Sequence, residues 1–194
     1  SGLADPAPVL QAFLSDPTLA GLYRIAAVIA TVDAINAAST FDAHEEALRQ
    51  AALADILVIT KLDLSQERAG DEAVLRHRLH ALNPGSDILL AGASDCQPAL
   101  LLRRDFPGPA AGAAWLHGAA HLHKHDSDHV HSPIESFCFV KDEPIPAGAL
   151  DMLLSALESN LGSRLLRVKG LVNVDGAPGP AVIQGAQHLL HNLT

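Results

Sequence analysis

Four consecutive residues, Thr60-Lys61-Leu62-Asp63, carry side chains suited to reading a purine base. The carboxylate of Asp63 can accept hydrogen bonds from both the ring N–H and the exocyclic amine of guanine, whereas adenine would leave at least one acceptor unpaired. Lys61 can lay its methylene groups against the base while its ammonium group reaches the sugar or a neighbouring loop. The structural alternative makes Asp63 a helix cap and leaves Lys61 in solvent.

A second group of chemically active residues is a run of six histidines within fifteen positions. Imidazoles bind Zn²⁺, Co²⁺, Ni²⁺ or Cu²⁺. Spacings of four would align them on a helix and spacings of two along a strand, so either conformation presents adjacent ligands. Because no fixed four-ligand pattern is visible, we predict weak, multi-site metal binding, with a solvated loop as the alternative. The predicted ligands are His117, His121, His123, His125, His129 and His131.

The chain contains no Gly-x-x-x-x-Gly-Lys-[Ser/Thr] segment, the loop whose backbone N–H groups and lysine surround nucleotide phosphates. Phosphate and Mg²⁺ positioning supplies most of the catalysis in phosphoryl transfer. We therefore predict that these residues alone bind GTP poorly or not at all, and we assign no catalytic residue. Asp33 is interpreted as a helix cap or loop residue. The four lysines, none of which follows a glycine, are Lys61, Lys124, Lys141 and Lys169.

Residues 23–99 alternate apolar, strand-like runs with amphipathic, helix-like runs. The run Ile56-Leu-Val-Ile59 is apolar on both faces, as expected for a covered parallel strand, and it ends directly before Thr60. Open α/β sheets bind ligands beyond the carboxyl ends of their strands, which is where this tetrapeptide lies. The alternation predicts an α/β fold with a partial doubly wound sheet. Strands are expected at 25–32, 56–59 and 87–90, and helices at 44–54 and 66–82.

A stretch rich in Pro, Gly and Ala between Phe106 and Gly118 is typical of a linker. A second folding unit begins near Pro133, and its expected helix 149–161 carries five leucines along one stripe. We expect a small α+β domain with strands at 134–140, 165–174 and 181–190. The predicted division is a partial nucleotide-binding domain at 1–112, a His-rich linker at 113–132 and a C-terminal domain at 133–194.

Charge and hydropathy exclude several classes of partner. The 13 Lys+Arg against 22 Asp+Glu give a formal net charge of −9, so no nucleic-acid partner is expected. No apolar run approaches the roughly 20 residues needed to cross a bilayer, so no membrane partner is expected. The two cysteines, Cys96 and Cys138, suit a reducing cytosol better than a disulfide scaffold. We expect a soluble, cytoplasmic protein.

Several motifs together resemble the CobW-like P-loop GTPases, a family that acts in cobalamin synthesis and in zinc or cobalt handling. The segment Ser1-Gly-Leu-Ala-Asp-Pro6 resembles the end of the switch II motif, and Thr60-Lys61-Leu62-Asp63 resembles the guanine-specificity motif, with Thr where Asn is more usual. The second half carries the C-terminal signature of the family. Its pieces are Ser136-Phe137, Leu166-Arg167-Val168-Lys169-Gly170 and Gln184-Gly185.

The resemblance implies a GTP-dependent metallochaperone or metal-insertion protein. Its ligands would be GTP or GDP with Mg²⁺ and Zn²⁺ or Co²⁺, its partner a metal-requiring client protein, and its nucleotide contacts Gly2, Thr60, Lys61 and Asp63. The family's P-loop, Cys-x-Cys-Cys motif and switch I have no counterpart in these residues, so we expect a fragment or a natural remnant. The alternative is a non-enzymatic metal-buffering or protein-interaction module. Unpaired strand edges also predict a possible homo-oligomer.

Overall fold

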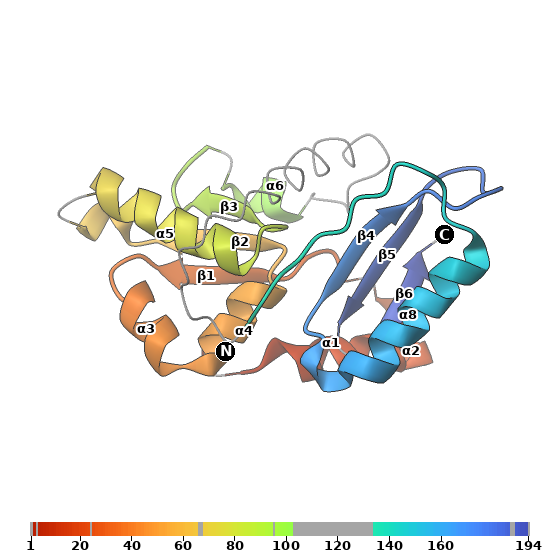
Figure 1. Ribbon diagram of the computed structural model, residues 1–194. Helices are drawn as coiled ribbons and strands as arrows, with labels where there is room; N and C mark the ends of the chain where they lie inside the picture. The colour runs from red at the N-terminus through yellow and green to blue at the C-terminus, as the bar shows by residue number, and fades with distance from the viewer. Residues whose placement is uncertain are drawn as a thin grey trace. The chain divides into compact units, whose positions relative to one another are not determined.

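The computed structural model describes residues 2, 4–23, 25–65, 68–94, 96–102, 134–186 and 189–193. The chain divides into two units, the first with residues 1–5 and 25–138 and the second with residues 6–24 and 139–194 (Figure 1). The two units are described separately.

The first unit is built on a parallel sheet of three strands, β1 (Ile29–Asp33), β2 (Ile56–Thr60) and β3 (Asp87–Leu90), in the spatial order β1-β2-β3. In the register, Asp33 is the partner of Thr60 and Ile59 is the partner of Leu90. The carboxyl ends of the three strands therefore lie at one edge of the sheet. This confirms the α/β class expected from the alternating pattern.

The central strand β2 is covered on both faces. Leu57 and Ile59 are completely buried, and Ile56 and Val58, which alternate with them, are buried as well. Ile56 and Val58 pack with Leu89 of β3, and Leu101 of α6 (Pro98–Leu102) packs against this cluster. Burial of four consecutive apolar side chains fixes β2 in the middle of the sheet.

Three helices of the first unit lie against one another, and α4 (Glu45–Leu53) contacts both α3 (Ala37–Ala43) and α5 (Arg68–Leu82). Arg78 of α5 lies 2.6 Å from the carboxylate of Asp42 and stacks over the Phe41 ring at 5.3 Å, and so connects α5 to α3. The amide of Asn83, just after α5, donates to the carbonyls of Ala51 and Ala54, each at 2.8 Å. These bonds satisfy carbonyl groups at the end of α4.

The second unit has an antiparallel sheet in the order β4-β5-β6, made of β4 (Val168–Val172), β5 (Ala181–Ala186) and β6 (Leu189–Leu193). Leu150 and Leu154 of α8 (Ala147–Leu161) pack with Ile183 of β5 to form its core. A short 3₁₀ turn, η3 (Gly162–Arg164), follows α8. The early helices α1 (Pro6–Ser15) and α2 (Pro17–Leu22) belong here too, because α1 contacts β5 and β6.

Two expectations for the second half were wrong. Residues 134–140 form no strand, although Phe137 and Phe139 alternate as in a strand and are 69% and 84% exposed. Alternation shows which side chains share a face, but it does not supply a neighbouring strand. The run 181–190, read as one strand, is two antiparallel strands, because Ala186 pairs with Leu189. No Asn-Gly, Gly-Gly or proline signal marks that reversal in the sequence.

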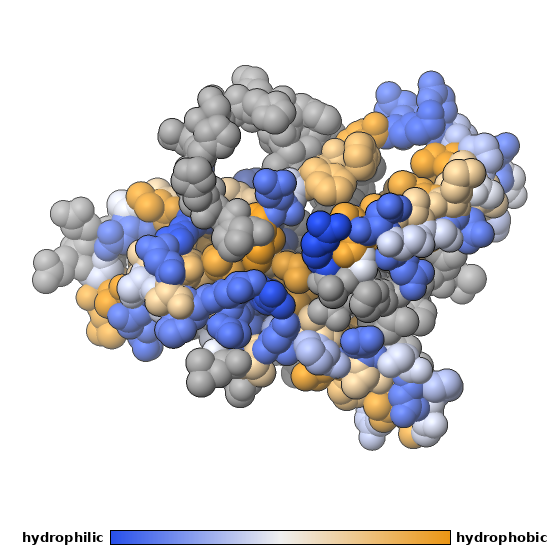
Figure 2. Space-filling view, turned by 60° about the horizontal axis from the view of Figure 1, so that its bottom comes forward, coloured by the Kyte–Doolittle hydropathy of each residue, from blue (hydrophilic) through white to orange (hydrophobic). Residues whose placement is uncertain are grey.

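Hydrophobic side chains are scattered among hydrophilic ones on the face shown in Figure 2. Within the described ranges no helix is long and apolar enough to cross a membrane. Large exposed hydrophobic residues include the adjacent pair Leu22 and Tyr23, Val74 and Met152, which come from three different parts of the chain. Isolated exposures of this kind are ordinary on protein surfaces.

Candidate nucleotide-binding site

The tetrapeptide Thr60-Lys61-Leu62-Asp63 lies at the carboxyl end of β2, where the sequence pattern places it. Lys61 adopts a left-handed backbone conformation with φ of 61°, and the 3₁₀ turn η1 (Leu62–Leu64) follows directly. The N–H of Leu64 donates to the carbonyl of Lys61 at 3.0 Å and closes the turn. The chain thus turns sharply as it leaves the strand, and Asp63 is exposed beyond the sheet.

Thr60 anchors this loop to the neighbouring strand. Its hydroxyl donates to the carbonyl of Val32 at 3.2 Å, and its own carbonyl accepts from the N–H of Ala34 at 2.9 Å. Thr60 stands where the family usually has Asn, a change that could be expected to loosen the loop. In this chain the hydroxyl makes an anchoring bond of its own.

Lys61 is paired with Asp33, the last residue of β1. Its ammonium lies 2.7 Å from the Asp33 carboxylate, which also accepts from the backbone N–H of Ile35 at 2.9 Å and from the side-chain amide of Asn36 at 2.9 Å. These donors, Lys61 first, lower the pKa of Asp33 from 3.8 to about 2. Asp33 is the last residue of β1, not the helix cap or loop residue expected from sequence, and it holds the Lys61 ammonium at the edge of the sheet.

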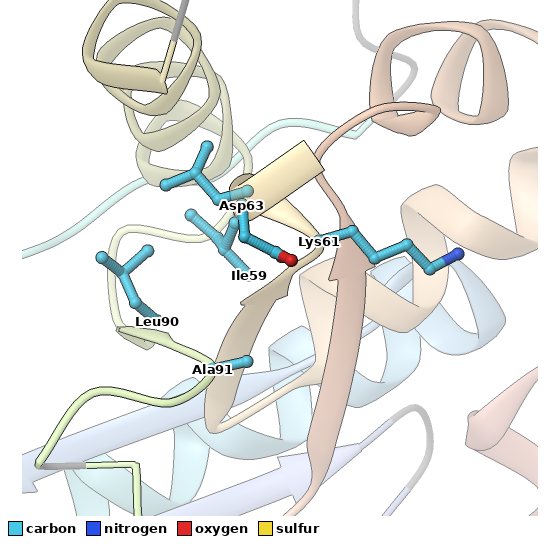
Figure 3. Close-up of a pocket in the computed structure, with 6 residues that line it drawn as sticks. Ile59, Lys61, Asp63, Leu90 and Ala91 are labelled. Atoms are coloured by element: carbon cyan, nitrogen blue, oxygen red, sulfur yellow. The ribbon is translucent and has the colours of Figure 1, made fainter. Parts of the chain in front are cut away.

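A surface pocket of about 280 Å³ opens beside the tetrapeptide. Figure 3 shows Asp63 on the pocket side of the loop, whereas the Lys61 side chain extends in the other direction, past the end of β1. The pocket is formed by the ends of two neighbouring strands and the residues just after them. They are Ile59, Lys61, Leu62, Asp63, Leu90 and Ala91.

The pocket offers groups that fit a purine base. A carboxylate beside apolar walls from Ile59 and Leu90 can pair with the two adjacent donors of guanine and leave the ring in apolar contact. The same residues do not fit a triphosphate. Among the side chains lining the pocket the only cation is Lys61, and its ammonium is engaged by Asp33.

Gly2, the fourth predicted contact, is not among the residues lining this pocket. It lies against α4, where the side-chain amide of Gln50 donates to the carbonyl of Ala4 at 2.8 Å and to that of Gly2 at 3.4 Å. Arg49 adds an ion pair to Asp5 at 3.1 Å. The carboxylates of Glu45 and Asp5 raise the pKa of Arg49 above its usual value. The segment that resembles switch II is therefore held by two adjacent side chains of α4.

All six predicted metal-binding histidines, His117 to His131, lie outside the described residues. Within the part of the chain that the structure does describe, no group of three or more His, Cys, Asp or Glu side chains is placed to hold a metal ion. Cys96 and Cys138 are both half-buried and form no disulfide.

Sequence reasoning missed two contributors to the site, Asp33 and Ala91. Asp33 was interpreted as a helix cap or loop residue and not as the partner of Lys61, and Ala91 was not considered. Asp33 ends β1 and Ala91 directly follows β3, the two strands adjacent to β2. Since the carboxyl ends of neighbouring parallel strands meet at one edge, the residue after each predicted strand was the available signal.

Residues 1–90 match the CobW/HypB/UreG nucleotide-binding domain, and residues 134–193 match the cobalamin synthesis protein cobW C-terminal domain. A curated relative, "Zinc chaperone YjiA" from Escherichia coli (strain K12), is 26% identical over 189 residues, which are 97% of this chain and 57% of the relative. The chain thus spans little more than half of that protein.

Two solved structures share the fold of this chain. The crystal structure of Zn(II)-bound YjiA GTPase from E. coli superposes with a TM-score of 0.69 at 23% identity, covering 99% of this chain and 58% of that one. A Zn(II)-bound triple mutant of the same protein gives the same values. At this identity the likeness shows the fold. Residues 1–90 and 134–193 are thus similar, in that order along the chain, to the nucleotide-binding and C-terminal domains of CobW-type proteins.

Proposed function

We propose that this chain is part of a GTP-dependent metallochaperone that carries zinc to a metal-requiring client protein. The observation that carries the proposal is the pocket at the carboxyl end of β2, where Asp63 faces a cavity suited to guanine. The His-rich segment 117–131 follows the nucleotide-binding half and supplies imidazoles for a metal. Zinc is favoured over cobalt as the cargo because the curated relative is named a zinc chaperone.

In this proposal guanine is read by Asp63, and Lys61 forms one wall of the base site. Phosphates and Mg²⁺ require the Gly-x-x-x-x-Gly-Lys-[Ser/Thr] loop, which these 194 residues do not contain. The base site alone therefore confers base selectivity and little affinity. A nucleotide with one phosphate is the suitable probe, since it tests the base contacts with the least contribution from missing phosphate contacts.

Base recognition is tested by titrating the ¹⁵N-labelled chain with GMP and, separately, with AMP. Amide signals of Asp63 and Ala91 are expected to shift with GMP at millimolar concentration and to shift much less with AMP. Asp63→Asn replaces one acceptor oxygen by a donor and should remove the preference. Equal shifts with both nucleotides in the unmodified chain would contradict the guanine site.

Metal binding is tested by calorimetry with Zn²⁺ and with Co²⁺. Replacing the six histidines between His117 and His131 by Asn should abolish most of the heat, because imidazole supplies the ligands. The matched control replaces His77 and His80, two exposed histidines of α5, and should bind zinc like the unmodified chain. Equal zinc binding by the six-histidine variant would contradict the assignment. Zinc affinity in the full-length protein that does not respond to GTP would favour the buffering module instead.

A further inference from the structure

The base-reading loop contains an unusual backbone position. Lys61 is the one residue other than glycine with positive φ in the described part of the chain. A side chain with a Cβ is disfavoured in the left-handed region, so surrounding contacts must hold it there. Asp63, the residue proposed to bind guanine, lies two positions further on, so the conformation of this turn determines its position.

The contact that reaches Lys61 from outside its own loop is the ion pair with Asp33. Donors other than Lys61 also orient the Asp33 carboxylate: the N–H of Ile35, the N–H of Asn36 and the side-chain amide of Asn36. A carboxylate that its own loop already orients loses little conformational entropy when it binds a cation. Charge-assisted bonds of this kind are stronger than neutral ones.

We propose that Asp33 is a positioning residue for base recognition, which holds the ammonium of Lys61 beyond the edge of the pocket and so fixes Lys61 as a wall and Asp63 as the acceptor. The inference rests on the proposed guanine site. Asp33 itself is not among the residues lining the pocket, and it acts through Lys61. The register supports this role, because Asp33 stands opposite Thr60, directly before Lys61.

The first test compares GMP affinities of the unmodified chain with those of Asp33→Asn, Lys61→Met and the double variant, by the NMR titration described above. Asp33→Asn is expected to weaken GMP binding about two- to fivefold, the range of a partly exposed ion pair. It should cause no further loss when Lys61 is already Met. Asp42→Asn is the matched control, because Asp42 also forms an ion pair in this unit, with Arg78, away from the pocket. Its GMP affinity should equal that of the unmodified chain.

The second test needs no nucleotide. The N–H groups of Leu64 and Ser65 close η1 by donating to Lys61 and Leu62. Asp33→Asn should raise their hydrogen-exchange rates by about threefold or more, while Asp42→Asn leaves them unchanged. Strand amides of β2 should keep their protection in both variants, which separates loop release from loss of the fold.

The outcomes separate the two proposals. The role of Asp33 would be overturned, and the guanine site would stand, if Asp33→Asn left selective GMP binding unchanged. The same conclusion would follow if Asp33→Asn reduced GMP affinity equally in the unmodified chain and in the Lys61→Met variant. Unchanged exchange at Leu64 and Ser65 would overturn it as well. Faster hydrogen exchange at Leu64 and Ser65 in Asp33→Asn, without selective GMP binding by the unmodified chain, would support Asp33 as the residue that fixes this loop. It would overturn the guanine site itself.

Discussion

The guanidinium of Arg49 lies 3.1 Å from the carboxylate of Asp5 and thereby ties the segment resembling switch II to α4. The same guanidinium holds Glu45 at 2.7 Å, so it is shared between the helix and the segment. Next to it, Gln50 binds two carbonyls of that segment. Gly2, Ala4 and Asp5 are therefore held by side chains of α4 and are not part of a strand.

Arg49→Met should release this segment while preserving the fold. Both partners are partly exposed, so the loss of stability should stay below about 1 kcal/mol. Exchange of the Ala4 and Asp5 amides should rise severalfold. Lys141→Met removes the exposed pair with Glu143 and is the matched control, with no change at Ala4 or Asp5. Unchanged exchange in Arg49→Met would show that the Arg49–Asp5 ion pair does not hold the segment.

Asn83→Ala should destabilise the first unit by about 1–3 kcal/mol per carbonyl left without a partner, because Ala51 and Ala54 both lose a buried donor. Hydrogen exchange of the Leu57 amide in β2 measures the unit directly. Asn160→Ala removes a similar bond, to Ala156, at an exposed position of α8 and should cost less than about 0.5 kcal/mol in the second unit. Equal losses of stability in Asn83→Ala and Asn160→Ala would mean that burial does not determine the cost of removing such a hydrogen bond.

Two adjacent leucines of α8 provide a matched pair for the second unit. Leu154 is 8% exposed and packs in the core, whereas Leu153 is 46% exposed. Leu154→Ala should cost about 2–4 kcal/mol and Leu153→Ala less than about 1 kcal/mol, measured from exchange of the Ile183 amide. Similar losses would contradict the orientation of the helix.

Sequence predicted the placement of Asp63 because burial leaves a local signature. A run of four apolar residues is typical of a covered strand or helix, and Thr60 marks where the run ends. The pairing of Lys61 with Asp33 was beyond reach, since it depends on which strand neighbours β2 and on the register of their ends. Periodicity along one strand carries no information about either.

The early helices show a different limit. No helix was expected between Pro6 and Leu22, yet Asp16 accepts from the N–H groups of Thr18 and Leu19 and caps α2, with Pro17 at its first position. This Asp-Pro pair was a readable start signal. The grouping of α1 and α2 with the C-terminal strands could not be predicted from sequence, because the apolar face of a helix does not indicate which element it packs against.

The Asp33 carboxyl should titrate with a pKa of about 2, below the ordinary 3.8, because Lys61 and Asn36 donate to its charged form. A depressed pKa stabilises the fold fully above pH 3.8, and this contribution is lost as the pH falls through about 2. Carboxyl ¹³C shifts measure the midpoint. Lys61→Met should move it up toward 3.8, while Lys141→Met leaves it in place. A midpoint near 3.8 in the unmodified chain would contradict the ion pair.

Zinc binding by the His-rich segment should fall steeply with acidification, because only the neutral imidazole is a ligand. With an ordinary imidazole pKa of about 6.5, each ligand loses about tenfold of its neutral form between pH 7.5 and 5.5. A site with two histidines should therefore lose about 100-fold in affinity, which competition with a chelator measures at both pH values. Carboxylates stay ionised over this range, so the six-histidine variant should keep whatever weak binding it has. A change of less than about tenfold in the unmodified chain would place zinc on carboxylates instead of the segment from His117 to His131.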